Sequence, residues 1–234
     1  MRPLVILKTG STLPRLVPRG DYEDWLAEGL RVPAIEVCRL SDGEALPAPD
    51  AVRAVVITGS AAMVTDRLDW SERAAAWLPE VIRRETPVLG VCYGHQLLAH
   101  ALGGEVGPNP RGREVGTIEV ELSEAATADP LFAGLGPRIV VSASHRQSVL
   151  RLPEGARHLG GNELDPNQAF AVGPRAWGVQ FHPEWDHAIA RVYVEEKLEA
   201  LRAEGIDPDA LLAKSRPSTD GATILRRFGE LSTG

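Results

Sequence analysis

The sequence predicts an α/β fold in which a mostly parallel central sheet is flanked by helices. Three features of the residue pattern support this prediction. Short apolar runs rich in β-branched residues recur over the first 91 residues, as expected for strands that are buried on both faces. Segments with apolar residues at three- and four-residue steps separate these runs, which is typical of helices. After Gly104 a strictly alternating segment appears, which is typical of an antiparallel strand with one face in water.

The first half of the chain contains the expected parallel unit. The predicted strands are residues 4–7, 34–37, 54–58 and 87–91. The predicted helices are residues 22–30, 69–84 and 95–102. The second of these helices has apolar residues at helical steps, and Gly103 and Gly104 form a stop signal for the third. Strands and helices in this alternation are joined by the right-handed crossovers of parallel sheets.

The second half contains a small antiparallel extension and a helical C-terminal region. Residues 117–122 alternate strictly between apolar and polar side chains, so this strand should have one exposed face. Further strands are predicted at 138–145 and 176–182, a long helix at 185–205, and a short helical stretch near 222–228. No repeat or Pro- or Gly-rich linker divides the chain. We therefore expect one domain over residues 1–234, with the C-terminal segment 206–234 packed on it.

Composition and charge argue against several classes of protein. The chain of 234 residues has a formal net charge of -7 and no cluster of Lys and Arg, which argues against a nucleic-acid-binding face. It has no secretory signal pattern and no apolar run long enough to cross a membrane, so we expect no membrane partner. Two cysteines are too few for a disulfide framework. Together these features predict a cytoplasmic protein.

Cys92 lies in a sequence context that favours a reactive thiol. It falls between the strand 87–91 and the following helix, at the edge of the sheet where open α/β folds bind ligands. Gly90 and Gly94 permit a sharp turn there, as in the elbows that expose other nucleophiles. The positive end of a helix favours the thiolate, which is the attacking form. Cys38, inside a predicted strand, is expected to be a buried structural cysteine.

A thiol nucleophile needs a base, and His182 is the best candidate. His182 ends a predicted strand, and Glu184 two residues later can accept the Nδ1 proton and orient the ring. His95 and His100 lie on the helix that begins beside Cys92, and their position alone places neither ring over the sulfur. An isolated His-Pro-Glu sequence would more often be an exposed turn. Its combination with the Cys92 turn favours a catalytic pair.

These motifs resemble those of a known enzyme family. The segment GVCYGHQ at residues 90–96, with HPE at 182–184, resembles the triad-type class I glutamine amidotransferases, especially free-standing domains related to the glutaminase part of GMP synthase. The resemblance covers nearly the whole chain and implies a flavodoxin-like fold with a small antiparallel extension. It implies that Cys92 is the nucleophile, that His182 is the general acid and base, and that Glu184 orients His182.

The resemblance also implies an oxyanion hole and a substrate pocket. The oxyanion hole would be formed by the backbone N–H groups of Gly59 and Tyr93. The residues implied to contact the substrate are Gln96, Ser144 and His145. Synthetase-linked relatives commonly carry an acidic residue two places after the histidine that corresponds to His145. This chain has Gln147 there, which leaves open both the bound substrate and any coupling to a synthetase.

The implied reaction is hydrolysis of the side-chain amide of glutamine to glutamate and ammonia through a cysteinyl thioester. It requires no metal and no organic cofactor. A separate synthetase is a possible partner that would receive the ammonia, since this chain has no P-loop pattern or ATP-binding module. Alternatives are a partner-independent hydrolase of γ-glutamyl amides or peptides, a non-catalytic regulatory module, and a cysteine peptidase on a similar fold. Gln96 and the His-Pro-Glu segment favour the amidotransferase chemistry over the peptidase.

Overall fold

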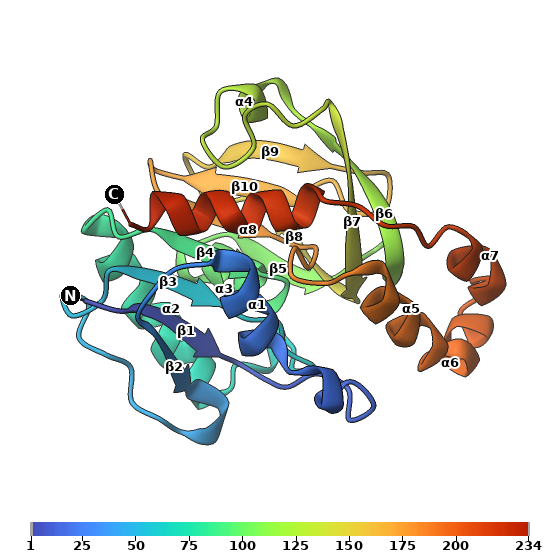
Figure 1. Cartoon of the computed structure of the whole chain (residues 1–234), viewed down its shortest axis with the longest axis horizontal. Coiled ribbons are helices and arrows are strands. Elements are labelled where there is room, and N and C mark those ends of the chain that lie inside the picture. The colour runs from blue at the N-terminus through green and yellow to red at the C-terminus, as the bar shows by residue number, and fades with distance from the viewer. Residues whose placement is uncertain (1, 234) are drawn as a thin grey trace.

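A computed structural model describes residues 2–233, in which nine strands form one mixed sheet (Figure 1). In spatial order the strands are β2 (Ile35–Arg39), β1 (Leu4–Lys8), β3 (Ala54–Ile57), β4 (Val88–Val91), β11 (Ala176–Val179), β10 (Ala169–Val172), β9 (Arg157–Gly161), β6 (Glu114–Leu122) and β7 (Arg138–His145). Neighbouring strands from β2 to β11 are parallel, and those from β11 to β7 are antiparallel. The predicted mostly parallel sheet with an antiparallel extension is confirmed.

Short elements complete the chain. A separate antiparallel pair is formed by β5 (Glu105–Pro108) and β8 (Gln147–Arg151). The α-helices are α1 (Tyr22–Leu30), α2 (Asp69–Arg83), α3 (Tyr93–Ala101), α4 (Glu124–Thr127), α5 (His187–Glu195), α6 (Leu198–Ala203), α7 (Pro208–Ala213) and α8 (Asp220–Leu231). In the part of the chain described, no helix has both the length and the apolar character needed to cross a bilayer.

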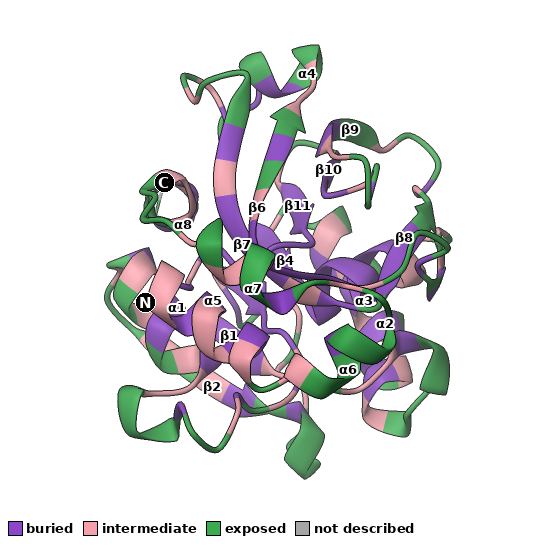
Figure 2. Ribbon diagram, turned by 90° about the vertical axis from the view of Figure 1, so that its right-hand side faces the viewer, coloured by how far each residue is buried: buried purple, intermediate pink, exposed green. Residues whose placement is uncertain are grey.

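The parallel half of the sheet is covered by helices on both faces. Alternate residues of β1 belong to different apolar clusters, because successive side chains of a strand point to opposite faces. Leu4 and Ile6 pack with residues of α1 and α8, whereas Val5 and Leu7 pack with residues of α2 and α3. Figure 2 shows that buried residues are concentrated on the central strands, while the outer turns and much of α6 and α7 are exposed.

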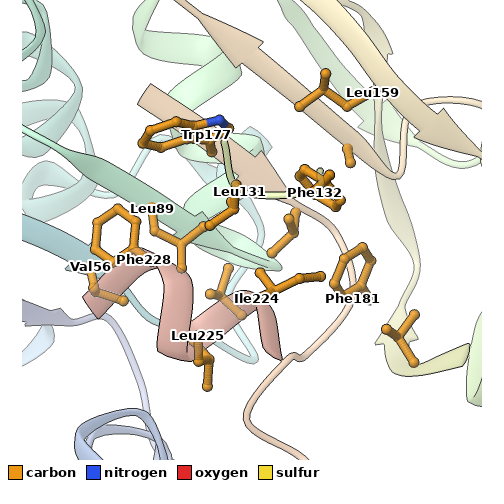
Figure 3. Packing of buried hydrophobic residues seen from close by; sticks show 14 of the residues in the cluster. Val56, Leu89, Leu131, Phe132, Leu159, Trp177, Phe181, Ile224, Leu225 and Phe228 are labelled. Carbon is orange, nitrogen blue, oxygen red and sulfur yellow. The ribbon is translucent and has the colours of Figure 1, made fainter. Parts of the chain in front are cut away.

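The C-terminal helix α8 is part of the main core. Ile224, Leu225 and Phe228 are almost completely buried, and Figure 3 shows Phe228 beside Leu89 of the sheet. The Phe228 ring meets the Trp177 ring edge to face, with centroids 6.2 Å apart. Helix α8 is longer than the short helical stretch predicted near 222–228. Burial of these side chains attaches the C-terminal segment to the sheet.

Two predicted elements differ from the structure in ways that affect the site. The long helix predicted at 185–205 is wrong, because α5 ends at Glu195 and α6 begins at Leu198. The break allows Leu201 of α6 to be buried in an aromatic-rich cluster with Trp185 and Tyr193. The strand predicted at 176–182 pairs regularly only as far as Val179.

Candidate active site

Cys92 occupies a strained turn between β4 and α3. Its backbone has a φ of 50° and a ψ of -99°, which is rare for a residue with a side chain. A Cβ on Gly90 would overlap the backbone carbonyl of Gly94, and a Cβ on Gly94 would lie 2.5 Å from the carbonyl oxygen of Ile57. Both positions therefore require glycine. The turn holds the thiol at the carboxyl edge of the sheet, as the spacing of the two glycines predicts.

His182 reaches Cys92 from the neighbouring strand β11. Three residues beyond Val179, the backbone N–H of His182 donates to the carbonyl oxygen of Ser142 at 2.7 Å, which anchors the segment to β7. The His182 Nδ1 donates to Oε1 of Glu184 at 2.7 Å, and the side chains of both residues are buried. The imidazole lies beside Cys92, since a Cβ on Gly59 would lie 3.5 Å from Nε2 of His182 and 3.7 Å from Cβ of Cys92. The three side chains form a continuous chain of contacts.

The charges of these residues support one another. Burial alone raises the pKa of the Cys92 thiol, but the charge and hydrogen bond of His182 outweigh burial and lower that pKa below its ordinary value. Burial alone lowers the pKa of His182, whereas the negative charges of Glu184 and Cys92 raise it well above its ordinary value. Both shifts favour a thiolate next to an imidazolium. This is the reactive form of a cysteine nucleophile.

The imidazole of His182 packs against two aromatic rings. Trp185 stacks on it with a centroid distance of 3.7 Å and an interplanar angle of 8°, and Tyr22 lies on it at 5.7 Å and 19°. Trp185 stacks in turn on Tyr193 at 4.0 Å. The hydroxyl of Tyr193 lies 2.8 Å from that of Tyr22 and 3.0 Å from that of Thr12. This packing was not predicted from the sequence, although Trp185 directly follows the His-Pro-Glu segment.

Two backbone N–H groups near the thiol have no hydrogen-bond acceptor among residues 2–233. A Cβ on Gly59 would lie 2.7 Å from Cε1 of His182 and 3.7 Å from Cβ of Cys92, so Gly59 packs against both side chains. The Gly59 carbonyl oxygen lies 3.0 Å from the hydroxyl oxygens of Thr9 and Thr58, which orients the peptide. Within residues 2–233, neither the N–H of Gly59 nor that of Tyr93, at the start of α3, has a hydrogen-bond acceptor. Such N–H groups can stabilise an oxyanion.

A cleft of about 410 Å³ opens above Cys92 and His182. Gln96, Ser144 and His145, the residues implied to contact substrate, all line it. The Gln96 amide nitrogen donates to the carbonyl oxygen of Gln147 at 2.8 Å and to Oε1 of Gln180 at 2.9 Å, which fixes its orientation. A larger groove of about 1170 Å³ crosses β6 but contains none of the residues around the thiol.

His145 lines the cleft, but its two ring nitrogens are engaged within the protein. Its Nε2 lies 2.9 Å from Oε2 of Glu114 and its Nδ1 lies 3.0 Å from the carbonyl oxygen of Gln147. Glu114 also accepts a hydrogen bond from Asn162 at 2.7 Å. Burial lowers the pKa of His145, but the hydrogen bond and charge of Glu114 raise it above its ordinary value overall. Both ring nitrogens are therefore used within the protein, and a positive charge lies near Cys92.

The remaining candidate side chains are structural. Burial lowers the pKa of His95 to about 4, and its ring packs against Phe170 with a centroid distance of 4.9 Å. His100 pairs with Glu72 at 3.1 Å, away from the cleft. Cys38 is buried in β2, and burial raises the pKa of its thiol. Across residues 2–233, no three His, Cys, Asp or Glu side chains are grouped as metal ligands.

Comparisons of sequence relate the chain to one family. The family model described as glutamine amidotransferase class-I matches residues 34–198. The glutamine-hydrolyzing GMP synthase of Porphyromonas gingivalis is 33% identical over 195 residues, which is 80% of this chain and 34% of that protein. One subunit of the glutamine-hydrolyzing GMP synthase of Methanosarcina acetivorans is 39% identical over 117 residues, which is 50% of this chain and 60% of that polypeptide. The chain thus spans about a third of the P. gingivalis enzyme.

Solved structures agree in fold. A glutamine amidotransferase from Thermotoga maritima superposes with a TM-score of 0.76 at 24% identity, over 99% of this chain and 98% of that one. A glutamine amidotransferase from Methylobacillus flagellatus gives a TM-score of 0.74 at 22% identity, over 100% of this chain and 93% of that one. The resemblance inferred from the motifs is confirmed: the chain belongs to the class I glutamine amidotransferase family.

Proposed function

We propose that this protein hydrolyses the side-chain amide of glutamine through a thioester on Cys92. The observation that supports this most directly is the contact chain from the Cys92 thiol through His182 to Glu184, at the base of a cleft. The family implies glutamine hydrolase activity, and the assignment of the three roles to these residues is our own. A non-catalytic module would have no physical reason to retain a thiolate beside its base.

The reaction begins with attack of the Cys92 thiolate on the amide carbon of the substrate. A sulfur–carbon bond forms, and the carbonyl oxygen takes the negative charge between the N–H groups of Gly59 and Tyr93. One such donor contributes about 3 kcal/mol to lowering the barrier. The C–N bond then breaks as the His182 imidazolium gives its proton to the departing nitrogen. The products of this half-reaction are ammonia and a γ-glutamyl thioester.

Water completes the cycle. Neutral His182 takes a proton from a water molecule, and the resulting hydroxide attacks the thioester carbon. The carbon–sulfur bond breaks, glutamate leaves, and the thiolate–imidazolium pair is restored. Glu184 holds the ring in the orientation that both proton transfers need, because it accepts the Nδ1 proton at 2.7 Å and leaves Nε2 for the reaction.

We further propose that a separate chain uses the ammonia. The M. acetivorans relative is named as one subunit of a glutamine-hydrolyzing GMP synthase, which supports an acceptor on another polypeptide. A partner-independent hydrolase of γ-glutamyl amides or peptides is the second candidate. It is favoured by the neutral Gln147 and by the absence of any Asp or Glu among the described residues that line the cleft.

The test is glutamate release from glutamine by the purified protein. The native protein should release glutamate, and Cys92→Ala should reduce the rate to background. The matched control is Cys38→Ala, which removes the other cysteine and should leave turnover unchanged, because Cys38 lies in β2 outside the cleft. Full activity of Cys92→Ala would remove the thioester mechanism. Stimulation only on addition of a synthetase would favour the coupled glutaminase over the independent hydrolase.

A further inference from the structure

The cleft that contains Cys92 is lined by cations and by no carboxylate. Of the described residues that line it, Arg113, Arg146 and Lys197 carry a positive charge, and none is Asp or Glu. The chain as a whole has 32 Asp and Glu residues against 25 Lys and Arg residues, so the cleft departs from the average surface. A cleft with one sign of charge concentrates ligands of the opposite sign.

Lys197 differs from Arg113 in forming no ion pair among residues 2–233, although the charge of Glu196 acts on it. Arg113 forms a bidentate ion pair with Glu204, with N–O distances of 2.9 and 2.8 Å. Among residues 2–233, no carboxylate lies within ion-pair distance of the Lys197 ammonium, whose Nζ instead lies 4.7 Å from the centroid of the Tyr193 ring. Burial, and next the charge of Arg113, lower the pKa of Lys197. A partly buried cation without a partner is unfavourable, and an anion in the cleft would relieve this.

The location of Lys197 indicates which part of a substrate it would meet. His182, Trp185 and Tyr193 are stacked in series at 3.7 and 4.0 Å, and the Lys197 ammonium lies over the last ring. The proposed proton transfer requires His182 to face the departing nitrogen. The rings of Trp185 and Tyr193 lie between His182 and Lys197, so Lys197 can meet only a leaving group that extends along this stack from the scissile nitrogen.

We propose that Lys197, assisted by the exposed Arg146, binds a carboxylate on the leaving group, so that among γ-glutamyl compounds larger than glutamine, γ-glutamyl peptides are preferred over compounds whose leaving group carries no carboxylate. This proposal rests on the proposed function of Cys92. Hydrolysis of such a substrate consumes one water and yields glutamate and a free amino acid or peptide. The departing nitrogen takes its proton from His182, as ammonia does in the hydrolysis of glutamine.

A matched pair of substrates isolates the carboxylate. γ-Glutamylglycylglycine and the same compound with a C-terminal amide differ only in a carboxylate that becomes a carboxamide in the second, and their leaving group is long enough to extend along the stacked rings. The native protein should favour the first by about tenfold in kcat/KM, as expected for one charge-assisted hydrogen bond. Lys197→Met should bring the ratio of kcat/KM for the two substrates close to one. Lys197→Arg should retain most of the native preference. Lys214→Met, at an exposed lysine outside this cleft, is the matched control and should retain the native ratio.

Two results would overturn the proposal. One is a kcat/KM ratio near one for the two substrates with the native protein. The other is an equal loss on both substrates in Lys197→Met, which would show that Lys197 binds the α-carboxylate of the γ-glutamyl group. Because both rates come from the same preparation, the ratio does not depend on the folded fraction. Calorimetric affinities of the two compounds for Cys92→Ala test the same discrimination without turnover, so failure of the carboxylate site is distinguishable from failure of the catalytic role of Cys92.

Discussion

Replacing Glu184 by Gln tests whether a buried carboxylate sets the charge of His182. The Glu184 side chain is fully buried, and its Oε1 accepts the Nδ1 proton of His182 at 2.7 Å. Oε2 of Glu184 has no hydrogen-bond partner among residues 2–233, so the carboxylate forms its side-chain hydrogen bond with the imidazole alone. Gln has the same shape without the charge. A charge-assisted hydrogen bond contributes about 1.5–3 kcal/mol, so we expect kcat/KM to fall by about 10- to 150-fold.

The same substitution should change the pH dependence in one direction. Burial lowers the pKa of His182, and the charges of Glu184 and Cys92 raise it above its ordinary value in the native protein. Without the charge of Glu184, His182 loses its proton at a lower pH. The imidazolium is the proposed acid that protonates the leaving group, so activity should be lost earlier as the pH rises. The alkaline limb of kcat/KM is therefore expected to move to lower pH.

The assay is glutamate release measured as kcat/KM across the pH range. Glu72→Gln is the matched control, because Glu72 also pairs with a histidine, His100 at 3.1 Å, but lies outside the cleft. This control should retain the native rate and profile. An alkaline limb of Glu184→Gln that coincides with the native limb would refute the electrostatic role of Glu184, whatever the loss in rate.

Two further substitutions test the geometry of the site and of the core. Gly59→Ala would place a Cβ 2.7 Å from Cε1 of the buried His182 ring, so the ring must move. We expect kcat/KM to fall by about 100-fold with little change in Tm, and native turnover would contradict the packing of Gly59 on His182. Phe228→Ala should lower the free energy of unfolding in urea by about 3–5 kcal/mol, since Phe228 is fully buried. Arg226→Ala, on the exposed side of α8, should change the free energy of unfolding by less than about 0.5 kcal/mol. Equal effects of Phe228→Ala and Arg226→Ala would show that α8 does not pack on the sheet.

The parallel half of the sheet is predictable from local pattern, whereas most of the antiparallel half is not. Strands β1, β3 and β4 are apolar runs because both of their faces are covered by helices. Strand β9 has exposed residues at Arg157 and His158 and ends in two glycines. Such segments have little strand preference of their own. Their conformation depends on pairing with distant partners such as β6.

The residues around the thiol are predictable to different degrees. Cys92 and His182 have local signals, because glycines mark the turn and a glutamate follows the histidine. The stacking of Tyr22 on His182 has no such signal, since the two residues are far apart in sequence and meet only in the folded chain. Lys197 was not predicted because a continuous helix at 185–205 would leave it as an ordinary surface lysine. Its position four residues after Tyr193 is compatible with their contact, but no local signal shows that Tyr193 lines the cleft.

The contact between Cys92 and His182 depends on the register of two strands. Strands β4 and β11 are parallel neighbours, Val91 pairs with Val179, and the N–H of Cys92 donates to the Val179 carbonyl oxygen at 2.9 Å. The positive φ of Cys92 costs of the order of 1–3 kcal/mol, and packing of α3 against β4 maintains it. A shift of one residue between these strands would exchange the two faces of the sheet and separate thiol from imidazole. The reactivity of the thiol is thus a property of the sheet as a whole, because the local motif supplies the residues and the pairing of β4 with β11 supplies their contact.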